Sequence, residues 1–204
     1  MMLRIENISH RYGSDNALEN VSFEIADGEF VALTGESGSG KSTLLSIVST
    51  LLRPTSGSVR FDDTAAAALG DLDRFRNEQV GFVFQFHYLI AHFTLFENVT
   101  LASRASKEEV MALMERLGIA ELAKRYPDEV SGGQRQRAAI ARALVNRPRY
   151  LFADEPTGNL DTANSANVFE LLRGLDATVV VATHDRSLLR PEDRIITLKD
   201  GRLC

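Results

Sequence analysis

The sequence predicts an α/β fold with a mostly parallel sheet, an antiparallel β piece at the N-terminal end and an inserted helical lobe. Short apolar runs of strand length alternate with helical stretches after residue 29. Two strand-like segments, 3–8 and 21–25, come before any long helix, and about 86–134 contains helix and loop but little strand pattern. No repeat, low-complexity tract or long linker divides the 204 residues. We therefore expect a single domain over 1–204.

The first half of the chain supplies the strand pair and the first helix. Segments 3–8 and 21–25 alternate polar and apolar residues, as half-buried strands do. Gly28 marks a turn before 29–35, an apolar run typical of an interior strand. Residues 41–52 are apolar nearly all round, which predicts a buried helix ended by Pro54. Further strands are expected at 58–61, 81–85, 149–154, 177–183 and 194–198.

Two helices are expected in the second half. Segment 106–118 opens with a capping box, Ser106 with Glu109, and carries apolar residues at helical spacing before Gly118. Segment 134–146 follows a serine and two glycines and reads as a second helix.

Composition and charge exclude several classes of protein. Hydrophobic residues make up 44% and charged residues 25%, the balance of an ordinary soluble globular protein. A net charge of −5 argues against a nucleic-acid partner. The single cysteine, Cys204, excludes an internal disulfide framework and fits a reducing compartment. No apolar run approaches the roughly 18–20 residues that span a bilayer, so work at a membrane would need another, spanning subunit.

The clearest motif is "GESGSGKST", residues 35–43, which matches G-x-x-x-x-G-K-[ST] after an apolar strand and before a helix. Its glycines let the backbone curl so that successive N–H groups face a phosphate. Lys41 can reach the β- and γ-phosphates, and the Ser42 hydroxyl can coordinate Mg²⁺. The alternative is a Gly/Ser-rich turn before a helix. Strand, loop, lysine and helix together favour an ATP and Mg²⁺ site in a P-loop NTPase core.

Polar groups follow three of the expected strands. Asp154 ends the strand 149–154 and Glu155 follows it directly. Asp154 can hold the Mg²⁺ shell, and Glu155 can orient or deprotonate an attacking water. His184 follows 177–183 and is placed for the γ-phosphate or that water. Gln85, at the end of 81–85, is a further candidate for Mg²⁺ or water. Alone, each would more often be a solvated or structural residue, so the hypothesis depends on the P-loop.

A second phosphate site is suggested by "VSGGQRQR", residues 130–137. A serine and two glycines before a helix leave free N–H groups and room for an anion. The alternative is a tight loop before a solvated, arginine-rich helix. The presence of the P-loop favours the functional interpretation.

These motifs occur in one order, P-loop, Gln85, "VSGGQ", "LFADE", "NLD" and His184, and with them the chain resembles, from end to end, the nucleotide-binding domain of an ABC-type ATPase. The resemblance implies three catalytic residues: Glu155, His184 and Lys41. It implies Ser42, Gln85 and Asp154 at the metal. It implies nucleotide contacts from Tyr12, Gly35, Glu36, Ser37, Gly38, Ser39, Gly40, Lys41, Ser42, Thr43, Gln85, Ser131, Gly132, Gly133, Gln134 and Asp161. Asp161 belongs to the D-loop of the family, together with Asn159 and Leu160.

Some residues allow two interpretations or depart from the pattern of the family. Tyr12 stands where the family stacks an aromatic ring on adenine, but a plain packing aromatic is the alternative. Val130 stands where leucine is commoner in the family. The helical lobe is also shorter than in the family, which affects how the lobe would contact a partner. Six aromatic residues crowd the stretch after 81: Phe82, Phe84, Phe86, Tyr88, Phe93 and Phe96. They predict either a lobe core or a docking groove for a partner.

The resemblance also implies partners. Each "SGGQ" would cap the ATP of the other subunit in a homodimer, and integral membrane permease subunits would receive the movement. The protein would then be peripheral, on the cytoplasmic side of the inner membrane. "PTGNLD" and "QFHYLIAHFTLFENV" are most similar to ATPases of lipoprotein-releasing and macrolide-export systems, with the cell-division ATPase close behind. A soluble regulatory or repair ATPase of the same fold and a P-loop kinase are the competing functions.

Overall fold

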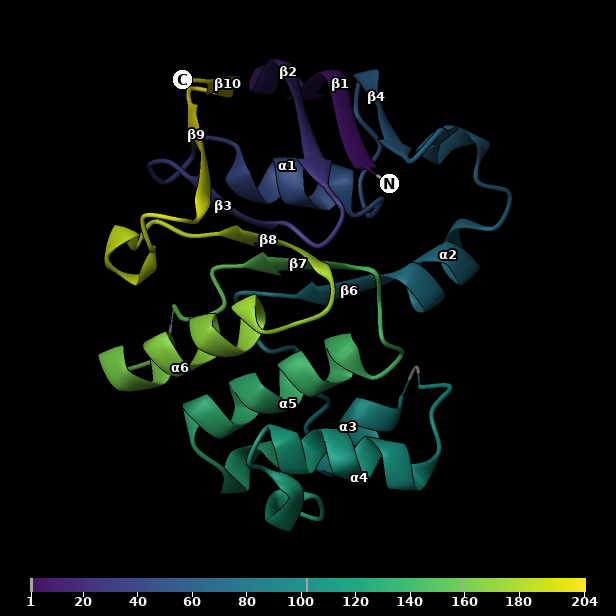
Figure 1. Ribbon diagram of the computed structural model, residues 1–204, viewed down its shortest axis with the longest axis vertical. Helices are drawn as coiled ribbons and strands as arrows, with labels where there is room; N and C mark the ends of the chain where they lie inside the picture. Colours follow the sequence, from purple (N-terminus) through teal and green to yellow (C-terminus); the bar gives the residue numbers. More distant parts are fainter. Residues whose placement is uncertain (1, 102, 159) are drawn as a thin grey trace.

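A computed structural model describes residues 2–101, 103–158 and 160–204, and it stacks two sheets and several helices in layers (Figure 1). One sheet is antiparallel, with the strand order β2-β1-β4-β5. Its strands are β1 (Met2–Tyr12), β2 (Asp15–Ala26), β4 (Ser56–Phe61) and β5 (Thr64–Ala65). The predicted antiparallel piece at the N-terminal end is therefore confirmed, and its hairpin is longer than the sequence pattern indicated.

The second sheet has the order β10-β9-β3-β8-β7-β6, and its strands pair in parallel from β9 to β6. Its strands are β3 (Phe30–Thr34), β6 (Val80–Val83), β7 (Tyr150–Asp154), β8 (Thr178–Ala182), β9 (Arg194–Lys199) and β10 (Arg202–Leu203). Because β3, β8, β7 and β6 are parallel neighbours, the segments that follow them emerge at one edge of the sheet. The predicted P-loop α/β core is confirmed.

Helix α1 (Lys41–Val48) lies between the two sheets (Figure 1). Buried residues of α1, of the antiparallel sheet and of one face of the parallel sheet form one apolar cluster. The predicted helix 41–52 ends sooner because Thr50 adopts a left-handed φ of 66°. Leu52 then donates to the carbonyl of Ser46 at 2.9 Å, which closes the helix end before Pro54.

Four helices lie on the other side of the parallel sheet: α3 (Leu95–Thr100), α4 (Lys107–Arg116), α5 (Gly132–Leu144) and α6 (Thr162–Arg173). Helices α5 and α6 lie next to the sheet, and α3 and α4 pack on the far side of α5 (Figure 1). Strand β7 shows why both faces are covered: Tyr150 and Phe152 belong to the α1 cluster, and Leu151 and Ala153 to the cluster of these four helices.

The segment 86–134 holds α3, α4, two short 3₁₀ turns, η2 (Ala120–Leu122) and η3 (Pro127–Glu129), and the start of α5. No strand occurs among its described residues. Ser106 and Glu109 form the predicted capping box. The chain also contains elements for which the sequence carried no prediction, among them α6, β5, β10, α2 (Leu72–Gln79), η1 (Ala66–Ala68) and η4 (Arg186–Leu188).

Candidate active site

The loop between β3 and α1 depends on two glycines that no other residue could replace without movement. Gly40 has a φ of 101°, and a Cβ there would lie 2.6 Å from the carbonyl oxygen of Ala17. At Gly35, with a φ of 150°, a Cβ would lie 2.3 Å from the carbonyl oxygen of Leu198. These close approaches hold the loop against β2 and β9, and α1 begins without a side-chain cap at Gly40.

Lys41 is buried beneath this loop. Its Nζ donates to the carbonyl oxygens of Gly35 and Glu36, both at 2.9 Å. An ammonium has three N–H donors, so one remains for a ligand. The first turn of α1 contains no acidic residue, so the amide groups at its N-terminal end stay favourable for an anion.

A cavity of about 470 Å³ gathers nine of the site residues that the sequence predicts. This volume falls in the range of small-molecule sites. Its lining residues are Ala17, Ser37, Gly38, Gly40, Lys41, Ser42, Thr43, Gln85, Glu155 and His184. The rest of the P-loop, Gly35, Glu36 and Ser39, lines a neighbouring hollow that also includes Ser37, Gly38 and His184.

Asp154, at the end of β7, fits a divalent cation. Burial raises the pKa of its carboxyl, which the Ser42 side chain opposes by hydrogen bonding. The buried Oδ1 atom of Asp154 has no hydrogen-bond partner among the residues that the structure describes. A hydroxyl and one carboxylate beside a phosphate site are the donors that Mg²⁺ takes in nucleotide enzymes. Ser42 and Asp154 therefore suit Mg²⁺.

Glu155 and His184 contact each other directly, which the sequence did not predict. Nδ1 of His184 lies 2.9 Å from Oε1 of Glu155. The Glu155 side chain is only 12% exposed, whereas that of His184 is 69% exposed. The backbone of Glu155 has a left-handed φ of 44°, and its N–H donates to the carbonyl of Ala182 at 2.9 Å. A glutamate held in this uncommon conformation at the cavity wall suits a functional role.

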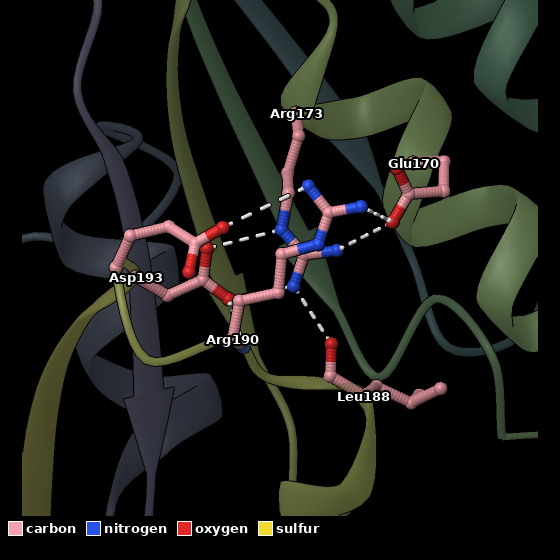
Figure 2. A network of polar contacts seen from close by, with 6 residues as sticks. Glu170, Arg173, Leu188, Arg190 and Asp193 are labelled. Atoms are coloured by element: carbon pink, nitrogen blue, oxygen red, sulfur yellow. Dashed lines mark hydrogen bonds and ion pairs between the residues drawn. The ribbon is translucent and has the colours of Figure 1, made fainter.

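The chain after His184 is tied to the end of α6 (Figure 2). The Arg173 guanidinium donates to the carbonyl of Leu188 at 2.7 Å and pairs with Asp193 at 2.6 Å. Glu170 accepts from Arg173 at 3.2 Å and from Arg190 at 2.5 Å. The Asp193 side chain is almost fully buried, and these bonds lower its pKa although burial opposes them. The network fixes the loop that leads from the cavity back to β9.

The second predicted phosphate site lies outside the cavity. Ser131, Gly132, Gly133 and Gln134 form the start of α5 and are absent from its lining. Ser131 is exposed, and a Cβ at Gly133 would lie 3.6 Å from Cγ of Asn164 on α6. Asp161 caps α6 by accepting from the N–H of that same Asn164 at 2.8 Å. The starts of α5 and α6 therefore lie side by side.

Tyr12 does not line the cavity. Tyr12 ends β1, is 54% exposed and packs edge-on against His10. Both interpretations of Tyr12 therefore stand: it is a strand aromatic with a ring contact, and its exposed side chain is free to stack on a base. Asn159 lies outside the described residues. No motif in the sequence pointed to Ala17, which reaches the cavity through the β1–β2 hairpin. Its close approach to Gly40 depends on the three-dimensional fold.

Known proteins of one family resemble this chain. A family model described as "ABC transporter" matches residues 18–158. The lipoprotein-releasing system ATP-binding protein LolD of Geobacter metallireducens is 44% identical, over 99% of this chain and 97% of that protein. The LolD of Bacteroides thetaiotaomicron is 40% identical, over 99% of both chains.

Solved structures agree as well. The dimeric structure of MJ0796, described as a bacterial ABC transporter cassette, matches with a TM-score of 0.90 and 38% identity, over 98% of this chain and 96% of that one. Its dimeric post-hydrolysis state, bound to ADP and phosphate, matches with a TM-score of 0.89. Fold, cavity, motif order and relatives all lead to one conclusion: this chain belongs to the ABC transporter family, as one of its ATP-binding, ATP-hydrolysing subunits.

Proposed function

We propose that the chain works as a homodimer that holds two ATP molecules between its subunits. The observation that carries the proposal is the separation of two surfaces within one chain. The P-loop, Gln85, Glu155 and His184 line one cavity, whereas Ser131 and the start of α5 lie outside it. A two-fold interface brings the α5 start of each chain onto the ATP of the other. The dimeric state of the related cassette supports this arrangement.

Within each cavity, the chain binds the phosphates from one side. The first amide groups of α1 and the remaining N–H of Lys41 bind the β- and γ-phosphates. Ser42 and Asp154 would hold Mg²⁺, with Gln85 as a further ligand, and a metal held there would supply positive charge against the phosphates. Tyr12, exposed on the β1–β2 hairpin, stacks on adenine, and Asp161 contacts the nucleotide from the α6 start.

Glu155 activates the attacking water. An ionised carboxylate can only accept hydrogen bonds, so Nδ1 of His184 carries the proton in the 2.9 Å contact with Oε1. This contact orients the carboxylate and leaves Oε2 to accept the proton of the water. His184 is the more exposed of the two and is placed to meet the γ-phosphate.

Loss of the γ-phosphate opens the dimer. Driving such a switch from 1:99 to 99:1 needs roughly 5.5 kcal/mol of differential binding. Charge-assisted contacts to phosphate at two symmetric sites supply a free energy of that order.

The partner of the dimer is a membrane permease that releases or exports lipoproteins. The names of the LolD relatives support this choice over a soluble regulatory ATPase. No helix in the described part of the chain is long and apolar enough to cross a membrane. The subunit therefore works peripherally, on the cytoplasmic side of the inner membrane. The whole chain acts as one ATP-binding domain, with 86–134 as its inserted lobe.

Some of the aromatic residues after 81 fit the docking groove, and others fit the core of the lobe. Phe86 and Tyr88 are 59% and 64% exposed, as a docking groove requires. Phe93 is half-buried, and Phe96 packs against the core of the four helices. We assign Phe86 and Tyr88 to the permease contact.

Dimerisation tests the proposal. Glu155→Gln keeps the phosphate-binding groups but cannot take up the proton, so turnover should fall by about 10²–10⁴-fold and ATP-bound dimers should accumulate. Size-exclusion chromatography with Mg-ATP measures this. Ser131→Arg should bind ATP but form no dimer, because its side chain obstructs the partner's phosphate. A Glu155→Gln variant that retains ATP yet stays monomeric at high concentration would contradict the model.

The permease contact has its own test. Tyr88→Ala should weaken co-purification with the membrane partner by more than about 2 kcal/mol of binding free energy, as expected for a large anchor. Because the side chain is mostly exposed, the melting temperature should change little. A large drop in melting temperature with normal partner binding would show that Tyr88 packs the fold instead.

A further inference from the structure

The chain that follows Gln85 is held by a helix that also carries the second phosphate-binding surface. After β6 ends at Val83, the segment 84–93 has no regular structure. Arg142, on α5, donates to the carbonyl oxygens of His87 at 2.6 Å and Tyr88 at 2.7 Å. One guanidinium thus binds two consecutive carbonyls shortly after Gln85.

The far end of this segment is fixed to α3. The Asn98 side chain is fully buried and accepts from the N–H of Ile90 at 2.7 Å. Its Nδ2 lies 3.1 Å from the carbonyl oxygen of Ile90 and 3.0 Å from that of Phe93. The segment after Gln85 is therefore anchored on α5 and α3, while Gln85 itself lines the cavity.

The Arg142 contact differs from an ordinary structural ion pair. Among the residues that the structure describes, no carboxylate pairs with Arg142. Burial lowers the pKa of its guanidinium. Tyr88 has a left-handed φ of 46°, which is uncommon for an aromatic residue. A half-buried guanidinium therefore binds two carbonyls of a turn that contains a left-handed residue, an arrangement that persists only where the surroundings impose it.

Helix α5 connects this contact to Ser131. The helix runs from its cap at Ser131 to Leu144, so Arg142 lies about 16 Å along one rigid rod from the cap. The other arginines of α5 bind elsewhere: Arg135 donates to the carbonyl of Val130, and Arg137 to that of Leu117 at 3.1 Å. Arg142 is thus the arginine of α5 that reaches the segment after Gln85.

We propose that Arg142 is a positioning residue for Gln85. Through the His87 and Tyr88 carbonyls it makes Gln85 follow the movement of α5, so that engagement of Ser131 by the partner's ATP sets the place of Gln85 in the cavity. The proposal rests on the roles given above to Gln85 and Ser131.

The test compares Arg142→Met with Arg137→Met in the purified full chain. Arg137 serves as the matched control, because it sits on the same helix and donates to a carbonyl of another segment. Arg142→Met should lower kcat for ATP between about 10- and 100-fold, the effect of misplacing a group by about an ångström. The KM for ATP should change little, since the P-loop is untouched. Arg137→Met should leave kcat near the wild-type value.

A double variant of Arg142 and Gln85 distinguishes a positioning role of Arg142 from a general loss of stability. If Arg142 acts through Gln85, the double variant Arg142→Met with Gln85→Ala should be no slower than Gln85→Ala alone. Losses that multiply would overturn the proposal, as would a folded Arg142→Met variant with normal kcat. Arg142→Lys keeps the charge but loses the planar guanidinium, so its kcat should lie between those of the wild type and Arg142→Met. This variant replaces Arg142→Met in the test if Arg142→Met does not fold. Normal kcat in Gln85→Ala would refute the role of Gln85 itself, and the proposal with it.

Discussion

Helices α1 and α5 both begin at glycine-rich turns, but they present their first amide groups in different ways. Gly40, before α1, has a left-handed backbone and no side chain that could cap the helix. Ser131, before α5, accepts from the N–H of Gln134 at 3.3 Å, and Gln134 accepts from the N–H of Ser131 at 2.9 Å. The start of α1 is thus open to a ligand, whereas the start of α5 caps itself.

Their surroundings differ in the same sense. The start of α1 lies in a cavity with Glu155 and His184, so one chain assembles a complete phosphate site there. The start of α5 lies on the surface beside α6, with Ser131 exposed. A self-capped, exposed helix start binds an anion weakly by itself. In the dimer proposed above, the partner's ATP supplies that ligand, and this proposal accounts for two glycine-rich helix starts in a single chain.

The sharpest way to test this contrast is to remove the cation of the complete site. Lys41→Ala should reduce ATP hydrolysis by about 10²–10³-fold, since Lys41 supplies a charged donor to the transferring phosphate. ATP affinity should fall by about 10- to 100-fold, the equivalent of one charge-assisted hydrogen bond. Isothermal titration and a phosphate-release assay measure the two effects. Lys124→Ala, at an exposed lysine, is the control. Near-normal turnover in Lys41→Ala would refute the assignment of this site.

A smaller effect separates capping from phosphate binding at α5. Ser131→Ala and Ser106→Ala remove the same kind of capping box, because Ser106 pairs with Glu109 as Ser131 pairs with Gln134. Each should cost about 1 kcal/mol of stability. Only Ser131→Ala should also lower hydrolysis and ATP-induced dimerisation, by about tenfold.

Differential scanning fluorimetry and size-exclusion chromatography on both variants decide the matter. Equal losses of melting temperature are expected. Normal turnover in Ser131→Ala would show that Ser131 is a cap and nothing more, and the contrast between the two helix starts would then reduce to one site and one structural turn.

The contrast also explains what could be predicted from the sequence. The strand-loop-helix of the P-loop and the box at Ser106 are local, so short-range spacing revealed them. The contact between Glu155 and His184 joins two strand ends, and the Arg142 contact crosses from α5 to the segment after β6. Such contacts depend on strand order, which no single segment encodes. Helix α2 was missed because it is short and strongly polar, with only Leu72 and Phe75 as apolar residues.

The smallest expected effect concerns the carboxylate that completes the α1 site. Burial raises the pKa of Asp154 in the folded chain, with the Ser42 hydrogen bond acting against it. The folded state therefore holds this proton to higher pH than the unfolded state does. The stability that protonated Asp154 contributes is full at low pH and is lost as pH rises through its folded pKa. At neutral pH, ionised Asp154 thus destabilises the nucleotide-free protein.

Asp154→Asn removes that charge, so without Mg-ATP the variant should melt at a higher temperature than the wild type at pH 7.5. The difference in melting temperature between the variant and the wild type should shrink as pH falls through the folded pKa of Asp154. This difference reports on Asp154 alone, because the other carboxyls titrate in both proteins. With Mg-ATP the order should reverse, because the wild type gains metal binding and the variant does not. A pH-independent difference for Asp154→Asn would mean that burial does not raise the pKa of Asp154, and the metal site would then lose its main structural support.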